Sequence, residues 1–396
     1  MTKWIECKIS DIGTIVGGAT PSTKKPENYE NGSIAWITPK DLSTLSGRYI
    51  QRGERNITEI GLKSCSTQLL PKNTVLFSSR APIGYVAIAE NSVCTNQGFK
   101  SVVPNENIDP LFLYYLLKYN KGTIESMGSG TTFKEVSGNT MKNIVVSVPT
   151  DKKAQETIAS TLGSIDDKIE ENEKINNNLE QQTMAMYTEK FENTSNSDRQ
   201  TCRADEYFDI AIGKTPPRKE TEWFSHNPSD VIWVSISDMG SCGLYISSSS
   251  EQLTPEAVER YNVKIVPDNT VLLSFKLTVG RIAITDGEMT TNEAIAHFKT
   301  DNKTINEYLY CYLKRFNYQT MGSTSSIATA VNSKIIKSMP FVVPTENELT
   351  KFHEFAAPMF DLIKSNLKEI DRLSAIRDTL LPKLMSGEID VSDIVL

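Results

Sequence analysis

The feature that most constrains this chain is an internal repeat that covers almost all of its 396 residues. Short motifs of the first half return in the same order in the second half, at an offset that stays between 194 and 197 residues. A motif order kept over that distance indicates a tandem duplication rather than a short-period solenoid, so both copies should adopt one fold. The paired segments are 18–21 and 213–216, 36–42 and 233–239, 70–76 and 266–272, 84–88 and 280–284, and 95–96 and 291–292.

Each copy begins with a segment that carries the signals of a mixed α+β domain. In the first copy, short runs rich in β-branched and aromatic residues alternate with turn residues, as expected of strands. A helix is predicted at 109–119, because Asp109 suits the N-cap position and Pro110 suits the first turn. The predicted strands are 34–37, 74–77, 85–88 and 144–146.

The segment 151–193 predicts one long helix that contains no proline. From Ile158 to Ile169 its apolar residues follow one another at steps of four and three, the spacing of a coiled-coil seam. Asn172 and Asn176 occupy the next two seam positions. At ~1.5 Å per residue the helix would be roughly 60 Å long, too long to lie on one small domain. It therefore needs a partner helix.

The second copy supplies that partner in residues 345–387. Its seam includes Leu362 and places Asn366 at the repeat offset from Asn172. Pro358 leaves two possible starts for this helix, near residue 345 or at Pro358 itself, because proline is tolerated in a first turn but disfavoured in a helix interior.

We expect the two helices to pair antiparallel, so that a pseudo-two-fold axis relates the halves and the globular domains lie at opposite ends. Asparagine at a seam weakens a dry core but sets the register of the helices. The predicted organisation is a globular domain at 1–150, a spacer helix at 151–193, a polar linker at 194–200, a second globular domain at 201–344, and a helix with its tail at 345–396.

The net charge of −7 is unevenly distributed along the chain. The first globular domain carries +4 and the second −2, whereas the two helical segments carry −5 and −4. Acidic helices repel phosphate, so a nucleic acid would contact the globular domains and leave the helices to protein partners.

Cysteine and histidine usage argues against metal and disulfide chemistry. The six cysteines are scattered without a C-x-x-C pair, and the three histidines are far apart, which favours a reducing cytosol and gives a zinc site little to build on. The apolar runs are too short to span a bilayer, and the first ten residues lack the apolar core of a signal peptide.

Enzyme interpretations find little support. Pro267 and Asp268 resemble the start of a nuclease motif, but the repeat places Pro71 and Lys72 at the same positions, so this segment is better interpreted as a turn. The chain has no phosphate-binding G-x-x-x-x-G-K-[ST] loop and no N/D-P-P-aromatic segment of an adenine methyltransferase.

On these motifs the chain resembles the specificity subunits of type I restriction–modification enzymes. Both halves have a G-x-T-P start, a P-x-N-T-V-L strand, a G-x-[IV]-A-I strand and a long helix, in one order over nearly the whole chain. The resemblance implies that each globular domain is a target-recognition domain that reads one half of a bipartite double-stranded DNA target. The helices would then set the gap, in steps of helical turns of about 34–36 Å.

The resemblance also implies a subunit without catalytic activity of its own. It would bind two methyltransferase subunits, and restriction subunits through them, and S-adenosylmethionine would belong to the methyltransferase rather than to this chain. Two alternatives stay open. One is the specificity subunit of a related type II system, and the other is a two-module coiled-coil scaffold that does not bind DNA.

The loop between the two best-matched strands is the first candidate for DNA contact. It carries a basic residue at the same place in both copies, and arginine can bind guanine through two hydrogen bonds while serine hydroxyls suit phosphates. The alternative is a hairpin turn with an incidental surface charge. The predicted contacts are Ser78, Ser79 and Arg80 in the first copy and Ser274, Lys276 and Arg281 in the second.

Three further groups complete the predicted contacts. Trp36 and Trp233 are predicted to be core residues rather than base-stacking residues. Asparagine and glutamine suit adenine edges, although asparagine is also an ordinary turn residue. The predicted contacts are Lys40 and Ser237 at the ends of the tryptophan strands, Asn96, Gln97 and Asn292 in a turn, and Thr131, Thr132 and Lys134 in a polar loop of the first copy alone.

Overall fold

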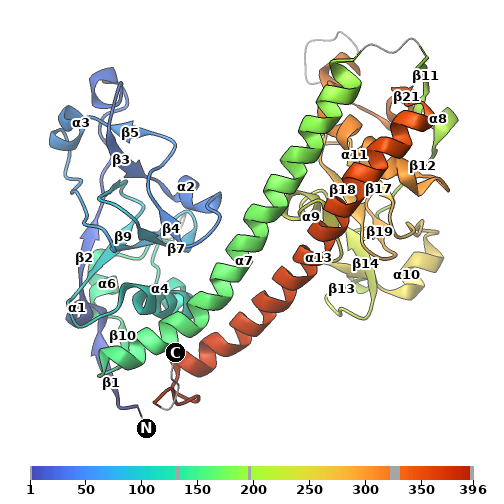
Figure 1. The fold of residues 1–396 in the computed structure, drawn as a ribbon. Helices are drawn as coiled ribbons and strands as arrows, with labels where there is room; N and C mark the ends of the chain where they lie inside the picture. The colour runs from blue at the N-terminus through green and yellow to red at the C-terminus, as the bar shows by residue number, and fades with distance from the viewer. Residues whose placement is uncertain (1, 131–133, 195–197, 322–330, 393–396) are drawn as a thin grey trace. The chain divides into compact units, whose positions relative to one another are not determined.

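The computed structural model describes residues 2–130, 134–194, 198–321 and 331–392 (Figure 1). The chain divides into two compact units. The first comprises Met1–Glu171 with Ile370–Leu396, and the second comprises Asn172–Glu369. Each unit contains one copy of the repeat and part of each long helix.

The first unit is built on a five-stranded sheet with the strand order β2-β9-β6-β7-β4, in which only β4 runs parallel to its neighbour. A three-stranded sheet, β5-β3-β8, and a two-stranded sheet, β1-β10, complete it. The strands are β1 (Trp4–Lys8), β2 (Gly13–Gly17), β3 (Ile34–Ile37), β4 (Tyr49–Ile50), β5 (Asn56–Ile57), β6 (Val75–Ser79), β7 (Ile83–Ala89), β8 (Cys94–Thr95), β9 (Lys100–Pro104) and β10 (Val145–Pro149).

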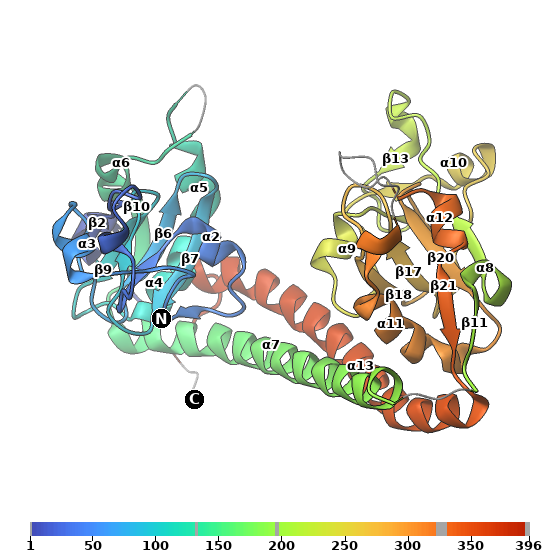
Figure 2. The ribbon, with the colours of Figure 1, turned by 90° about the horizontal axis from the view of Figure 1, so that it is seen from above.

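The four strands predicted in the first copy are confirmed as β3, β6, β7 and β10. The predicted helix is confirmed as α4, where the Asp109 carboxylate accepts a hydrogen bond from the amide of Phe112. Helix α4 packs against β6 and β7 (Figure 2). The short helices of this unit are α1 (Ile9–Ile12), α2 (Pro39–Ser43), α3 (Glu59–Lys63), α4 (Pro110–Tyr119), α5 (Lys121–Ser126) and α6 (Gly138–Asn143), with a 3-10 turn at Pro26–Asn28.

The second unit repeats this plan, which confirms the duplication. Its five-stranded sheet has the order β12-β20-β17-β18-β15, and again only the last strand, β15, runs parallel to its neighbour. The strands are β11 (Gln200–Arg203), β12 (Asp209–Ile212), β13 (Phe224–Ser225), β14 (Val231–Val234), β15 (Tyr245–Ile246), β16 (Gln252–Leu253), β17 (Val271–Ser274), β18 (Ile282–Thr285), β19 (Thr290–Thr291), β20 (Ile295–Lys299) and β21 (Pro340–Val343).

Helix α11 covers β17 and β18 as α4 covers its sheet in the first unit (Figure 2). The second unit also has a four-stranded sheet, β13-β16-β14-β19, and a two-stranded sheet, β11-β21. Its short helices are α8 (Ala204–Tyr207), α9 (Asp238–Ser241), α10 (Pro255–Arg260), α11 (Asn306–Arg315) and α12 (Ser333–Lys337), with 3-10 turns at Thr221–Trp223, Lys303–Ile305 and Tyr318–Met321.

The two predicted long helices are α7 (Lys152–Tyr187) and α13 (Glu346–Met385). A π-helical segment, Thr188–Glu192, extends α7 almost to the predicted end. Helix α13 begins next to Thr345, whose amide and hydroxyl both bind the Glu348 carboxylate, and it continues through Pro358. The alternative start at Pro358 is therefore wrong, because the capping pair already stabilises the first turn upstream.

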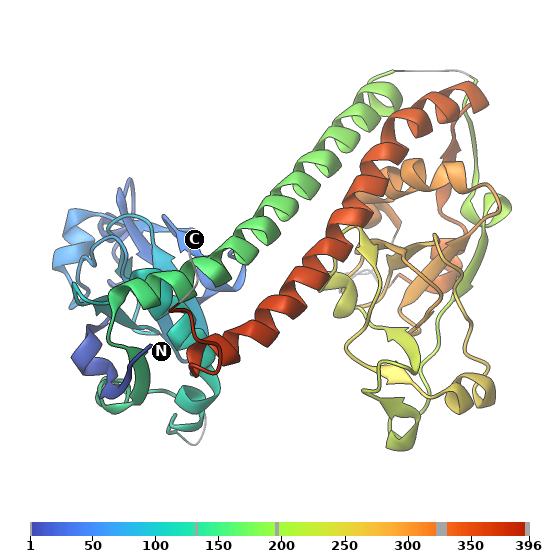
Figure 3. The ribbon, with the colours of Figure 1, turned by 60° about the horizontal axis from the view of Figure 1, so that its bottom comes forward.

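Within each unit the parts of α7 and α13 run antiparallel, as predicted. In the first unit Arg377 binds Asp166 at 2.9 Å. In the second unit the two helices lie side by side (Figure 3), and the residue numbers of the contacts between them rise along α7 and fall along α13. These contacts join Asn172 to Glu369 at 2.8 Å, Asn176 to Asn366 at 2.8 Å, and Thr183 to Met359 at 3.4 Å.

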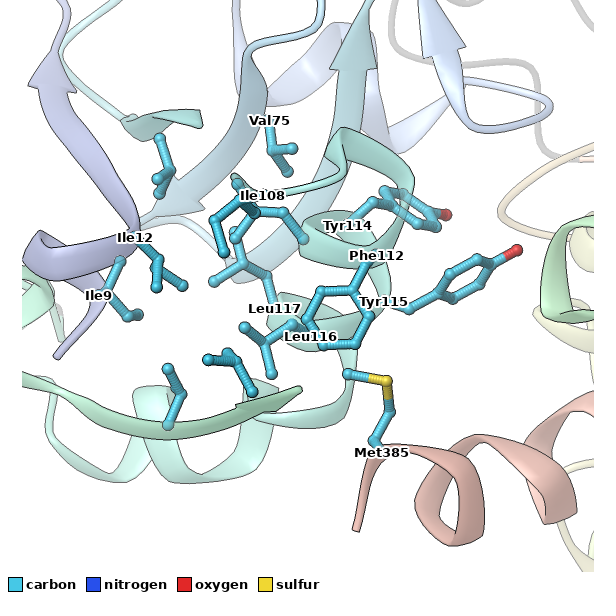
Figure 4. Packing of buried hydrophobic residues seen from close by; sticks show 14 of the residues in the cluster. Ile9, Ile12, Val75, Ile108, Phe112, Tyr114, Tyr115, Leu116, Leu117 and Met385 are labelled. Carbon is cyan, nitrogen blue, oxygen red and sulfur yellow. The ribbon is translucent and has the colours of Figure 1, made fainter. Parts of the chain in front are cut away.

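Each unit has its own hydrophobic core, and both long helices contribute to each core. In the first unit, Ile158 and Leu162 of α7 are buried in one cluster with residues of α4. Met385, at the end of α13, belongs to the same cluster and points toward α4 (Figure 4). In the second unit Phe360 and Ile363 of α13 are buried among residues of α11, whereas Leu362 is 46% exposed. The seam position predicted for Leu362 is therefore wrong, because this part of α13 turns its apolar side toward the sheet domain.

Candidate nucleic-acid interface

The buried tryptophan of each copy holds the G-x-T-P segment in place. Trp36 and Trp233 are buried, as predicted, and their indole N–H groups donate at 3.1 Å to the carbonyl oxygens of Ala19 and Lys214. A Cβ at Gly18 would lie 2.2 Å from the Thr95 carbonyl oxygen, so only glycine fits there. The segment is thereby fixed against the turn that follows β8 or β19.

The hairpin loops at 78–84 and 274–280 have one backbone shape, set by a buried serine. The Ser78 hydroxyl donates to the Pro82 carbonyl and accepts from the Tyr85 amide, both at 2.8 Å. The Ser274 hydroxyl donates to the Thr278 carbonyl at 2.6 Å and accepts from the Arg281 amide at 3.0 Å.

Backbone dihedral angles show the same equivalence. Ala81 and Leu277 have φ values of 51° and 58°, and Gly84 and Gly280 have φ values of 98° and 92°. A left-handed backbone at a non-glycine residue is uncommon. Its recurrence at the same loop position indicates that both loops are held in a defined shape.

In the first copy the loop presents a cluster of charged side chains. Arg80 lies 3.5 Å from Glu135, and Lys100 lies 3.2 Å from the same carboxylate. Lys134, which precedes Glu135 in the chain, is exposed. Ser79 is fully buried, and its hydroxyl donates to the Gly98 carbonyl at 3.2 Å.

In the second copy the loop presents a cation and an apolar side chain. Lys276 is exposed, and Leu277 next to it is 100% exposed. Arg281 is turned inward instead, because its guanidinium donates to the Ile236 carbonyl at 2.5 Å.

The turns after β8 and β19 are also equivalent. The side-chain oxygen of Asn96 accepts from the Gly98 amide at 2.8 Å, and that of Asn292 accepts from the Ala294 amide at 3.0 Å. Both asparagines therefore shape the turn, whereas Gln97 is exposed.

The remaining predicted residues lie at helix starts or outside the described part of the chain. Exposed Lys40 lies in the first turn of α2 and pairs with Glu54 at 2.8 Å, and exposed Ser237 precedes α9. Thr131 and Thr132 lie outside the described residues. In each copy a backbone hydrogen bond joins the hairpin loop to the turn. The Ser79 amide donates to the Gly98 carbonyl, and the Phe275 amide donates to the Ala294 carbonyl. The structure thus brings the loop and turn residues of each copy together.

Sequence reasoning did not include several residues that complete these clusters. Lys100 and Glu135 meet Arg80, although they lie 20 and 55 residues further along the chain. Thr20 and Thr215 contact the exposed residue of each turn. Their recurrence in both G-x-T-P motifs was a signal that could have pointed to them, whereas no sequence signal pointed to Glu135.

In the second copy, the surroundings of Glu293 favour the charged form of its carboxylate. Partial burial raises the pKa of Glu293, but the hydrogen bond from Thr215 and the positive charges of Lys276 and Arg218 outweigh it, so the pKa is lowered overall. Glu293 is therefore ionised at neutral pH.

No group of three or more His, Cys, Asp or Glu side chains in the described part of the chain could hold a metal ion. None of the helices in that part is both long and apolar enough to cross a membrane.

The fold and the two equivalent clusters define a protein with two recognition modules on one duplicated frame. The family described as Type I restriction modification DNA specificity domain matches residues 1–181 and 196–373, so the chain belongs to this family. The predicted resemblance to type I specificity subunits is thereby confirmed.

Two relatives of this chain match it over nearly its whole length. The type I restriction enzyme MjaIX specificity subunit of Methanocaldococcus jannaschii is 33% identical, over 99% of this chain and 94% of the relative. The HindI specificity subunit of Haemophilus influenzae is 22% identical, over 98% of this chain and all of the relative (100%). The crystal structure of a type I S subunit from M. genitalium shares the fold, with a TM-score of 0.58, 18% identity and coverage of 97% of this chain and 96% of that one.

Proposed function

We propose that this chain is the DNA-reading subunit of a type I restriction–modification complex and has no catalytic activity of its own. Residues 1–150 and 201–344 would each read one half of a bipartite target, and α7 and α13 would set the gap between the half-sites. The observation that carries this proposal is that both copies keep one backbone frame and expose different side chains on it. A protein built in this way can read two different half-sites with one architecture.

Exposure separates direct contacts from supporting residues within the proposed interface. Arg80, Lys134 and Gln97 of the first copy, and Lys276 and Ser237 of the second, have exposed or partly exposed side chains. Lys40 is exposed as well. We assign these to contact with phosphates or bases. The buried Ser78, Ser79 and Ser274 and the inward-turned Arg281 would instead hold the loops in shape.

The distribution of charge supports DNA contact by the globular domains and protein contact by the helices. The first globular domain carries a net charge of +4, and Arg80 of its loop and Lys100 of β9 pair with one carboxylate, that of Glu135. The segments 151–200 and 345–396 are acidic, with −5 and −4. Acidic surfaces repel phosphate, so the helices are poorly suited to DNA and are left for protein partners. These partners would be two methyltransferase subunits, and restriction subunits bound through them, in the cytoplasm.

The test is expression of the full chain with a methyltransferase subunit from the same organism, followed by mapping of methylated bases across the host genome. The expected result is one bipartite motif with a fixed gap, with modification that depends on this chain. No such motif would contradict the proposal and favour the scaffold alternative. Modification by a single fused nuclease–methylase partner would favour the related type II system instead.

A further inference from the structure

One position of the proposed interface differs in chemistry between the copies while its surroundings are the same. This position is Gln97 in the turn after β8 and Glu293 in the turn after β19. Both side chains are exposed. A repeated frame around one changed side chain is the arrangement expected where two modules distinguish different ligands.

The turns that carry the two side chains have equivalent hydrogen bonds in both copies. The preceding asparagine amides donate to the carbonyl oxygens of Ile37 and Val234 at 3.0 and 2.9 Å. The asparagine side chains close the turn on the residue that follows, Gly98 or Ala294. Because both hydrogen bonds occur in each copy, the side chains of Gln97 and Glu293 extend from equivalent backbone positions.

A threonine holds each exposed side chain in position. The Thr20 hydroxyl donates to Oε1 of Gln97, and the Thr215 hydroxyl donates to Oε2 of Glu293. These bonds involve Oε1 of Gln97 and Oε2 of Glu293, so the amide group of Gln97 and Oε1 of Glu293 lie outside the contact with threonine. Fixing a side chain before it binds reduces the conformational entropy lost on binding.

The turn lies beside the basic hairpin loop in both copies. The Ser79 amide donates to the Gly98 carbonyl at 2.7 Å, and the Phe275 amide donates to the Ala294 carbonyl at 2.9 Å. The positive charge of Lys276 is one of the causes that lower the pKa of Glu293. A cation on the loop can neutralise a phosphate while the neighbouring turn reaches a base edge.

We propose that Gln97 and Glu293 are the equivalent base-reading residues of the two domains, with Gln97 reading adenine and Glu293 reading cytosine. This inference rests on the proposed function. A glutamine amide can donate to adenine N7 and accept from its N6 amino group. A carboxylate only accepts, so it favours the N4 amino group of cytosine, which has no neighbouring N7 acceptor to repel it.

The test exchanges the two side chains in the full chain, which is expressed with its methyltransferase. With Glu293→Gln we expect one cytosine of one half-site to be replaced by adenine, or to be no longer discriminated, while the other half-site is unchanged. With Gln97→Glu we expect the converse change in the other half-site. Discrimination at the affected position should change by roughly tenfold to a hundredfold, the usual effect of one base contact.

Binding of the purified complex to duplexes that carry single base-pair changes gives the same readout if a variant no longer methylates. Glu259→Gln, an exposed carboxylate of α10, is the matched control and should leave both half-sites unchanged. The inference is overturned if both exchanges leave every position of the motif as in the wild type. A wild-type complex without any bipartite motif would instead contradict the proposed function.

Discussion

At the scale of single residues, the two hairpin loops differ in the surroundings of their basic side chain. Arg80 pairs with Glu135 at 3.5 Å, with its side chain 35% exposed. Lys276 extends into solvent beside Leu277. An ion pair of this exposure contributes little to stability, so Arg80 can exchange Glu135 for a phosphate or a base at little cost.

We expect Arg80→Ala and Lys276→Ala each to weaken DNA binding without loss of assembly with the methyltransferase. A lost base contact corresponds to about 1–3 kcal/mol of discrimination, whereas a lost phosphate contact weakens binding to all sequences and reduces its salt dependence. Titration of a labelled duplex at two salt concentrations separates the two cases. Lys63→Ala, an exposed lysine of α3, is the control. Unchanged affinity at moderate salt would remove the loop from the interface.

A second residue of interest is His297, which is fully buried in the sheet of the second unit. Its Nε2 lies 2.7 Å from the Thr291 hydroxyl, and its Nδ1 has no hydrogen-bond partner in the part of the chain that the structure describes. Burial, with a smaller contribution from Lys299, lowers the pKa of His297 from 6.5 to about 4. The imidazole is therefore neutral in the folded protein at neutral pH.

This lowered pKa predicts acid sensitivity of the second unit. Between pH 6.5 and 4 the unfolded chain binds a proton that the folded chain excludes, so the free energy of unfolding falls as the pH decreases. At ~1.4 kcal/mol per pKa unit, the loss reaches about 3 kcal/mol. His297→Ser, which introduces the residue found at the equivalent Ser101, should flatten this dependence. Denaturant unfolding at several pH values measures it, and equal slopes for variant and wild type would refute the assignment.

At the scale of elements, the paired helices carry polar side chains where a coiled coil usually carries apolar ones. Asn172 is 1% exposed and Asn366 is 8% exposed. They are bound across the helix pair to Glu369 and Asn176 at 2.8 Å. A buried polar pair costs stability, but it disfavours shifted registers that would break the hydrogen bond between its side chains.

The Asn176–Asn366 pair can be tested by comparing single and double substitutions. Asn366→Leu should destabilise the protein by about 1–3 kcal/mol, because the side chain of Asn176 would lose its partner in a largely buried site. Asn176→Leu with Asn366→Leu should recover most of that loss and relax the register. Thermal unfolding and the spread of gap lengths in methylated motifs are the measurements. A double variant as unstable as the sum of the single variants would argue against register control.

At the scale of the whole molecule, each core is completed by a long helix that begins in the other copy of the repeat. Leu384 and Met385 of α13, which follows the second copy, are buried in the first core. Tyr187 of α7, which follows the first copy, is buried in the second core, with Phe191 packed against it. The two closing segments are therefore equivalent, at an offset close to that of the repeat.

Deletion of residues 201–396 should therefore yield a protein that dimerises. The truncated chain lacks the α13 segment that covers its own core but retains the equivalent end of α7, which can cover the core of a second copy. Two identical domains should then specify a symmetric target. Light scattering gives the mass of the truncated protein, and methylated-base mapping gives its target. A folded monomer, or loss of all modification, would count against the equivalence of the two closing segments.

The sequence by itself determined the elements and their duplication, because these depend on local signals. The apolar spacing predicted α7, Asp109 marked the start of α4, and the constant offset identified the second copy. Trp36 was also correctly predicted as a core residue. Such features follow from residue type and spacing over a few turns or strands, so they can be recognised without the fold.

Only the tertiary structure decided which side chains remain available for a ligand. Ser78 and Ser274 carry suitable hydroxyls, but backbone groups four and seven residues away already bind them. Glu135 reaches Arg80 from 55 residues away. Burial and pairing depend on partners that folding brings together from distant segments, and a side chain's type does not specify them.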